Sequence, residues 1–460
     1  MARTQIDLTR GPIFRKLLLF SLPILLGSIV TEFYNVADSM IVGRFIGAQA
    51  LAAVSACSPS SSIINMFLVG LQVGASVVVA QKVGARDREH LEDAVNTIAS
   101  LTLISALLLA VGGLALTRTL LTALNTPEEI YDDAAVYMSV IFIGTAGNLT
   151  YNVGSGVLRG MGDSTWSFIF LVMCSLLNLV LDIVAVQVLG AGVAGVAVAT
   201  AVSQLLSGLG MVARLNRSDY GARLHLRSLR IVRAEALLLA GIALPAAVQN
   251  VGNALAALFM QSYVNFFGSS FAAANNIVNR VEAFSDIPIM ALTSALCTFV
   301  GQNIACGRLR RVYKGINGTI ALLCGLGVII CAVLILCREA LPLMFTGDAE
   351  VGGYAAVGIF IISFVAIYNG IDRALLNAMR AVGRSVVPMI TAQFGCMTRI
   401  LFGYLLAVRT GDWRGIFLAM ALATFARMAA IAVYYYCMGG KRAIERYPEQ
   451  HGVSVDDALT

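Results

Sequence analysis

The sequence predicts an all-α polytopic membrane protein: twelve transmembrane helices in two pseudo-symmetric six-helix bundles. Three observations support this fold class. The 460 residues are 58% hydrophobic and only 13% charged, and their mean hydropathy is +0.82, whereas a soluble domain of this size carries more charge. About twelve apolar segments are each long enough to cross a bilayer as a helix, and none alternates like a barrel strand. The second half of the chain also repeats the first.

The apolar segments give the expected helices, because roughly 20 apolar residues in helical form span the hydrocarbon core. They lie at 14–43, 51–80, 93–117, 132–158, 165–187, 190–214, 235–265, 270–302, 314–337, 353–381, 385–409 and 412–438. We therefore expect an N-terminal bundle over 1–213, a cytoplasmic linker over 214–234, a C-terminal bundle over 235–440 and a cytoplasmic tail over 441–460.

The distribution of Lys and Arg predicts the orientation of the chain. With these spans, 23 basic residues fall on the side that holds both termini, five fall on the other side, and Arg280, Arg373, Arg399 and Arg427 lie within spans. Since cytoplasmic loops are enriched in Lys and Arg, both termini are expected in the cytoplasm. The same rule explains the arginine-rich linker better than nucleic-acid binding does.

An internal repeat is visible when the chain is shifted by 221 residues. The shift aligns Gln81 with Gln302, Asn148 with Asn369, Arg159 with Arg380, Gly162 with Gly383, and Ser164 with Ser385. Six spans per half give both halves the same orientation, so an axis along the membrane normal relates them. Proteins of this kind place the substrate cavity between the repeats and alternate its access. Lipid flippases share this symmetry, which therefore predicts transport without defining the substrate.

The first span carries acids at depths that lipid disfavours. Glu32, Asn35 and Asp38 lie three residues apart, roughly on one side of a helix. A carboxylate there must face protein or a water-filled cavity. Glu32 is equally consistent with a salt-bridged structural acid near the membrane surface. In the fifth span, Asn178 and Asp182 share a helix face at i, i+4.

Polar groups in the first half form a candidate cation-coupling site. The candidates are Asp38, Asn152, Asn178, Asp182 and Thr200. Their oxygen atoms suit Na⁺, for which Asp38, Asn178 and Asp182 are the proposed ligands, and two close carboxylates also hold a shared proton. For Asn152 and Thr200, ordinary helix–helix hydrogen bonding is an equal alternative.

The second half lacks this acid pair. The repeat aligns Asn178 with Arg399 and Asp182 with Gly403. The eighth span instead carries Glu282 and Asp286 at i, i+4. With Glu32, these two acids are candidate substrate-binding residues for a cationic solute. The alternative for the pair is ion pairing with Arg280, Arg373 or Arg399.

Enzymatic and metal chemistry have little support in the sequence. The nine cysteines include no CxxC pair, and the three histidines fall in polar loops or the tail. No nucleophile–base pair lies within the spans. We therefore expect no enzyme activity and no cofactor other than H⁺ or Na⁺ as coupling ion.

Several stretches together resemble the multidrug and toxin extrusion (MATE) family over nearly the whole chain. They are YNVADSMIVGRFIG (34–47), LRGMGDS (158–164), NLVLD (178–182), GVAGVAVAT (192–200) and FVGQN (299–303). The first-half acids resemble the DinF-like bacterial and archaeal branch, whose N-terminal lobe holds the H⁺ or Na⁺ site. The NorM-like branch uses an acid in the seventh span, where this chain has the amides Gln249, Asn250 and Asn253 and no carboxylate in the middle of the span.

The resemblance implies a secondary active antiporter of the bacterial or archaeal cytoplasmic (inner) membrane. It would export cationic or amphiphilic organic solutes in exchange for H⁺ or Na⁺ by alternating access. The alternative function is a lipid-linked precursor flippase of the same superfamily. The expected partners are small organic substrates and the lipid bilayer, with no nucleic acid, and we expect the chain to function as a monomer.

Overall fold

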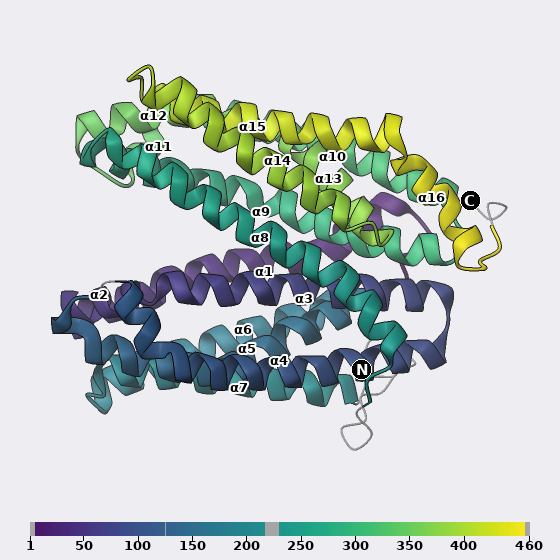
Figure 1. Cartoon of the computed structure of the whole chain (residues 1–460), viewed down its shortest axis with the longest axis horizontal. Coiled ribbons are helices and arrows are strands. Elements are labelled where there is room, and N and C mark those ends of the chain that lie inside the picture. Colours follow the sequence, from purple (N-terminus) through teal and green to yellow (C-terminus); the bar gives the residue numbers. More distant parts are fainter. Residues whose placement is uncertain (1–4, 125, 217–229, 456–460) are drawn as a thin grey trace. The chain divides into compact units, whose positions relative to one another are not determined.

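The computed structural model describes residues 5–124, 126–216 and 230–455, whose regular structure is entirely helical (Figure 1). Within these ranges, eleven helices are long and apolar enough to cross a membrane. A bent helix pair, if counted as one span, makes the number twelve. This confirms the predicted fold class. The chain forms two compact units, Met1–Asp7 with Leu22–Ala243 (unit 1) and Leu8–Ser21 with Leu244–Thr460 (unit 2).

Unit 1 is built around a long central helix, α5, which packs on α3, α4 and α7, while α6 packs on α7. Two π-helical segments, Val42–Ile46 and Val184–Val188, continue α1 and α6. The helices are α1 (Ile13–Ile41), α2 (Ala48–Ala56), α3 (Ser58–Ala85), α4 (Arg88–Ala123), α5 (Glu128–Gly160), α6 (Ser164–Ile183) and α7 (Gly192–Asn216).

Unit 2 has a similar plan, in which α13 packs on α9, α10 and α15, and α14 packs on α15. The bent pair is α12 and α13, which meet at 48°. The helices are α8 (Arg233–Phe266), α9 (Ser269–Ala305), α10 (Leu309–Cys337), α11 (Ala340–Leu343), α12 (Ala349–Ser363), α13 (Val365–Ala381), α14 (Val386–Gly403), α15 (Arg414–Val433) and α16 (Gly440–Gln450).

The sequence repeat is also a repeat of backbone structure. A shift of 221 residues carries the start of α4 onto the start of α10, and it carries Gly162 onto Gly383. These glycines follow α5 and α13 and have φ of 90° and 82°. A positive φ after a helix favours glycine, which has no Cβ to clash. In both halves, therefore, a glycine with positive φ ends the corresponding helix.

Each unit also contains the start of the opening helix of the other half. The Leu8 carbonyl, at the start of the α1 segment of unit 2, accepts hydrogen bonds from Asn303 Nδ2 and Arg311 Nη2, both at 3.2 Å. In unit 1, near the start of α8, buried Glu235 pairs with Lys82 at 2.7 Å. The units thus divide inside α1 and α8 instead of at the expected bundle limits, 213 and 235. Residues 217–229 of the expected linker lie outside the described residues.

Small residues allow α5 to approach its neighbours closely. A Cβ added to Gly147 would lie 2.4 Å from the backbone carbonyl carbon of Gln204 in α7, and one added to Gly156 would lie 2.4 Å from the Gln72 carbonyl oxygen in α3. Backbone atoms cannot give way as a flexible side chain can. Close approach through small residues is the usual mode of helix packing in membranes.

We expect Gly147→Ala to destabilise the protein, because the added methyl group forces α5 and α7 apart. Overpacking of this kind costs about 1–3 kcal/mol. The apparent thermal unfolding midpoint of the detergent-solubilised protein is the measurement. The control is Gly112→Ala in α4, where an added Cβ meets nothing within 4 Å. Equal midpoints for the two variants would contradict the close contact.

Candidate functional site

Four of the five predicted coupling residues come together in unit 1, on α1, α6 and α7. Asn178 and Asp182 lie one turn apart on the buried face of α6, at 1% and 0% exposure. α6 begins at Asp163, whose side chain accepts a hydrogen bond from the Trp166 backbone N–H and fixes the start of the helix. Asp38, on α1, completes the carboxyl pair.

The Asn178 side chain is the centre of this cluster. Its amide lies 2.9 Å from both Asp182 Oδ2 and Tyr34 Oη on one side, and 3.3 Å from Thr200 Oγ1 and 3.1 Å from Thr200 N on the other. Hydrogen bonding assigns its orientation. The nitrogen donates to Asp182 and Tyr34, and the oxygen accepts from Thr200. The amide therefore holds α1, α6 and α7 together at the level of the acids.

The carboxyl groups of Asp38 and Asp182 lie close enough to interact with each other. Two ionised carboxylates that interact in this way repel each other, so a proton or a small cation between them is favourable. One oxygen of each, Oδ1, is buried and has no hydrogen-bond partner. These two oxygens accept no hydrogen bond from the described protein groups, so they are available to bind a proton or a small cation.

A cavity of about 220 Å³, lined mainly by residues that carry a hydroxyl or amide group, adjoins the carboxyl pair within unit 1. Asn178 and Thr200 belong to both the cluster and the cavity wall. Asn152, the fifth predicted residue, also lines the cavity, and its Nδ2 donates to Asn148 Oδ1 at 2.6 Å. The structure places Asn152 in the wall and gives it no hydrogen bond to the acids. The lining residues are Thr31, Tyr34, Asn148, Tyr151, Asn152, Leu171, Cys174, Ser175, Asn178, Thr200, Ser203, Gln204 and Ser207.

The three candidate substrate-binding acids have different surroundings. Glu32 is half-buried on α1 in unit 1, and among the described residues it forms no hydrogen bond or ion pair. Asp286, on α9 in unit 2, forms an ion pair with Arg373 and accepts a hydrogen bond from Asn369 Nδ2 at 2.7 Å. Sequence analysis gave ion pairing with Arg373 as one alternative to substrate binding, and the structure shows this ion pair for Asp286. Glu282 lies one turn earlier on α9 and is half-buried.

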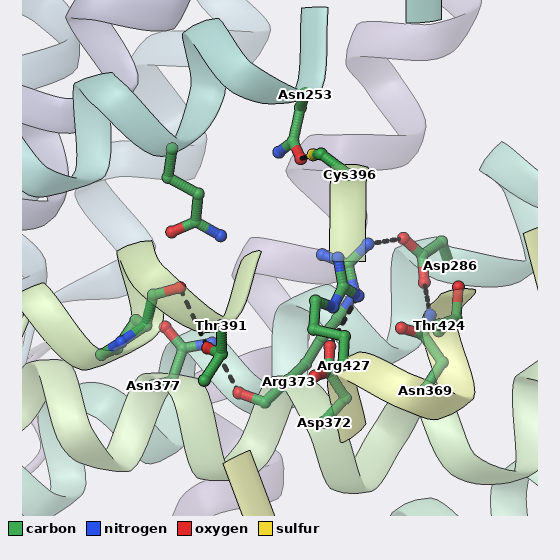
Figure 2. Close-up of polar contacts among 12 residues, drawn as sticks. Asn253, Asp286, Asn369, Asp372, Arg373, Asn377, Thr391, Cys396, Thr424 and Arg427 are labelled. Atoms are coloured by element: carbon green, nitrogen blue, oxygen red, sulfur yellow. Dashed lines mark hydrogen bonds and ion pairs between the residues drawn. The ribbon is translucent and has the colours of Figure 1, made fainter. Parts of the chain in front are cut away.

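Unit 2 therefore contains an ion-pair network in which acids and arginines are matched. Figure 2 shows Asp286 beside Arg373 and Asn369, with Arg427 next to Asp372. Arg427 Nη2 lies 2.6 Å from Asp372 Oδ2, linking α15 to α13. Pairing of this kind reduces the cost of placing charge at membrane depth.

Sequence analysis missed Tyr34 as a site residue. It lies one turn before Asp38 on α1, and its hydroxyl contacts the same amide that binds Asp182. The i, i+4 spacing from Asp38 was a usable signal, because such residues share a helix face. Asn148 and Gln204 were also missed as cavity residues, and the sequence offers no periodic signal that separates them from other polar groups.

The fold and site define a class: a helical membrane transporter of two repeated units, with a carboxyl pair beside a polar cavity. The chain belongs to the MatE family, whose sequence profile matches it twice, over residues 23–184 and 245–405. Its curated relatives include multidrug transporters, so we describe the chain as a member of a multidrug efflux transporter family.

Individual relatives agree with this assignment. The probable multidrug resistance protein YpnP of Bacillus subtilis (strain 168) is 28% identical over 451 residues, which cover 96% of this chain and 99% of the relative. The FAD transporter of Shewanella oneidensis is 26% identical, over 87% of this chain and 92% of the relative. A crystal structure of MATE in the bent conformation has a TM-score of 0.88 at 23% identity and covers 97% of this chain and 98% of its own, which shows the fold.

We expect Tyr34→Phe to lower stability, because it removes a hydrogen-bond acceptor from the buried Asn178 amide. Loss of one such bond costs about 1 kcal/mol. The thermal unfolding midpoint of the purified protein checks this. Tyr137→Phe is the matched control, since the Tyr137 hydroxyl has no hydrogen-bond partner among the described residues. If both variants shift the midpoint equally, Tyr34 has no special role in holding Asn178.

Proposed function

We propose that the protein is a secondary active antiporter that exports organic solutes in exchange for a cation. The observation that supports this proposal is the Asp38–Asp182 carboxyl pair beside a polar cavity in the same unit. A coupling ion drives transport only if it binds one conformation better than another. A buried carboxyl pair meets that requirement, because its net charge changes when the ion leaves.

The hydrogen bonding supports H⁺ as the coupling ion better than Na⁺. A proton shared between the two carboxyl groups would remove their mutual repulsion. The Asn178 oxygen, an expected Na⁺ ligand, faces Thr200, and the amide nitrogen faces Asp182. A Na⁺ ion between the acids would therefore lack the Asn178 oxygen as a ligand.

The cavity supports a cationic or amphiphilic solute. Its wall carries hydroxyl and amide groups together with the aromatic rings of Tyr34 and Tyr151. The carboxyl pair beside it favours a positive group on the solute when the proton has left. The proton and the cationic solute would therefore compete for the negative charge of the carboxyl pair, and this competition would couple proton entry to solute export. The lipid-linked flippase is the rival, and the same assay tests it.

Asp38→Asn and Asp182→Asn are each expected to abolish exchange driven by a pH gradient, because an amide cannot bind and release the proton. The assay follows ethidium in proteoliposomes under a pH gradient or a Na⁺ gradient, each imposed alone. The expected loss is at least about tenfold, equivalent to about 1.4 kcal/mol in the coupled step. Exposed Asp133→Asn is the control.

Wild-type exchange in both Asp variants would defeat the proposed role of the pair. Exchange driven by Na⁺ alone would replace H⁺ with Na⁺ as the coupling ion. Scrambling of a fluorescent lipid without ethidium transport would favour the flippase.

We further propose that both termini are cytoplasmic. α4 carries Glu89 in its first turn and ends shortly before Glu129, which lies in the first turn of α5, and the 36 residues of α4 are long enough to cross the membrane. In a variant with the native cysteines replaced, Glu89→Cys should react with a membrane-impermeant thiol reagent only in inside-out vesicles, and Glu129→Cys only in intact cells. The reversed pattern would invert the orientation.

A further inference from the structure

The last helix of unit 2, α16, lies across the end of α15. Figure 1 shows its yellow ribbon turning steeply away from α15. The turn is made at two glycines: Gly439 has a φ of 151°, and a Cβ added to Gly440 would lie 2.5 Å from the Tyr435 Cα. Since α15 and its π-helical extension are long and apolar enough to cross the membrane, a helix that turns away from their end lies near the membrane surface.

One face of α16 is fixed to the rest of unit 2. The Tyr313 hydroxyl of α10 lies 3.2 Å from the Lys441 carbonyl oxygen and 3.3 Å from Glu445 Oε1. The buried residues recur at helical spacing along one side of α16, and they are Gly440, Ile444, Tyr447 and Pro448. The other side of the helix is exposed, so α16 is an amphipathic helix whose buried side packs on its own unit.

The exposed side of α16 and the adjoining start of α10 are strongly basic. Arg310, Tyr313 and Lys314 share one face of α10 at i, i+3 and i+4, and Tyr313 contacts α16. In the described part of the chain, Lys314, Arg442 and Arg446 form no ion pair. The only acids of α16 are Glu445 and Glu449. The exposed basic residues, here called the basic patch, are Arg310, Lys314, Lys441, Arg442 and Arg446.

The corresponding region of unit 1 carries the opposite charge. A shift of 221 residues aligns Arg310 with Glu89 and Lys314 with Asp93. Asp93 forms an ion pair with Arg230, just before α8, so the charges there are matched within unit 1. An acid in the first turn of a helix interacts favourably with the helix dipole, whereas a basic residue there does not. The positive charge at the start of α10 therefore points to a compensating anion outside the protein.

The basic patch adjoins a surface suited to lipid. Tyr436 and Met438, in the last turn before α16, are 51% and 70% exposed. Lys441 Nζ lies 4.8 Å from the centre of the Tyr436 ring. Tyrosine at the end of a spanning helix, with lysine or arginine beside it, is typical of the membrane–water interface. An exposed apolar surface that continues into positive charge matches a phospholipid, which has acyl chains below a charged head group.

We propose that the basic patch of unit 2 binds acidic phospholipid head groups at the membrane surface. A lipid phosphate accepts charge-assisted hydrogen bonds from arginine and lysine. Clusters of roughly four to eight basic residues beside a transmembrane helix or on an amphipathic helix are typical of binding to acidic lipids. The inference names a lipid partner of unit 2, and it goes beyond the proposed export function, on which it does not depend.

The test uses the full chain with a single tryptophan beside the basic patch. Trp166→Phe and Trp413→Phe remove the two native tryptophans, and Tyr436→Trp introduces the reporter. The protein is reconstituted in mixtures of phosphatidylcholine and phosphatidylglycerol, one of which has brominated acyl chains. Quenching of the reporter by each brominated lipid gives their relative affinity at this position. Phosphatidylglycerol should be favoured by about fivefold, because only its head group has a net negative charge.

Charge-removing variants of the reporter protein should abolish this preference. Arg442→Gln combined with Arg446→Gln removes two basic residues of α16 without touching its buried side. Lys314→Asp, which introduces the residue that unit 1 has at this position, should lower the preference as well. The matched control is Arg88→Gln combined with Arg233→Gln, which removes two exposed basic residues of unit 1 and should leave the preference unchanged. Added salt should weaken the preference, since exposed charges are screened.

Equal quenching by the two brominated lipids would overturn the proposal and leave the basic patch to a soluble partner. An equal loss of preference in the unit 1 control would also overturn it. A preference that inorganic phosphate removes at constant ionic strength would assign the patch to a free anion instead. If the reporter protein does not fold, native mass spectrometry decides: the wild type should retain phosphatidylglycerol from an equimolar lipid mixture, and equal retention by the Arg442→Gln, Arg446→Gln variant would contradict the proposal.

Discussion

Uncompensated charge at membrane depth is the constraint on which the rest of this structure depends. The hydrocarbon core offers no water to an ionised side chain, so each acid or arginine there needs a partner in the protein, a bound ion or a wet cavity. The chain meets this requirement in two ways. Unit 1 places its acids together beside a cavity, and unit 2 pairs Asp286 and Asp372 with arginines across α9, α13 and α15.

The two units thus use one scaffold for different chemistry. At the positions where unit 1 carries the amides Asn152 and Asn178, unit 2 carries Arg373 and Arg399. The helix framework is insensitive to the exchange, because the glycines and helix ends that define it recur at the same spacing. Duplication followed by divergence at a few facing positions is sufficient to give two unlike sites in one chain.

Helix number, the repeat and the grouping of Asp38, Asn178, Asp182 and Thr200 could be predicted from the sequence. Lipid demands long apolar segments, so the spans were readable from composition alone. Asp38 and Asp182 were identifiable because carboxylates in such segments are rare. The partner of Asp286 was not predictable, since several arginines lay in the same half and only the packing of α13 against α9 decides among them. The division of α1 and α8 between the units was missed for a similar reason. Hydropathy indicates which residues lie within the membrane, but it does not indicate which helices they pack against.

The division of α1 and α8 has a consequence for how the chain could have arisen. Each unit incorporates the first part of a helix that the other half of the sequence encodes, and the change of unit falls within two residues of Pro23 and Pro245. A single six-helix polypeptide with this architecture would lack the start of its own opening helix and would need a second copy to supply it. In the present chain both copies belong to one polypeptide, so this exchange of helix starts is intramolecular and does not depend on protein concentration.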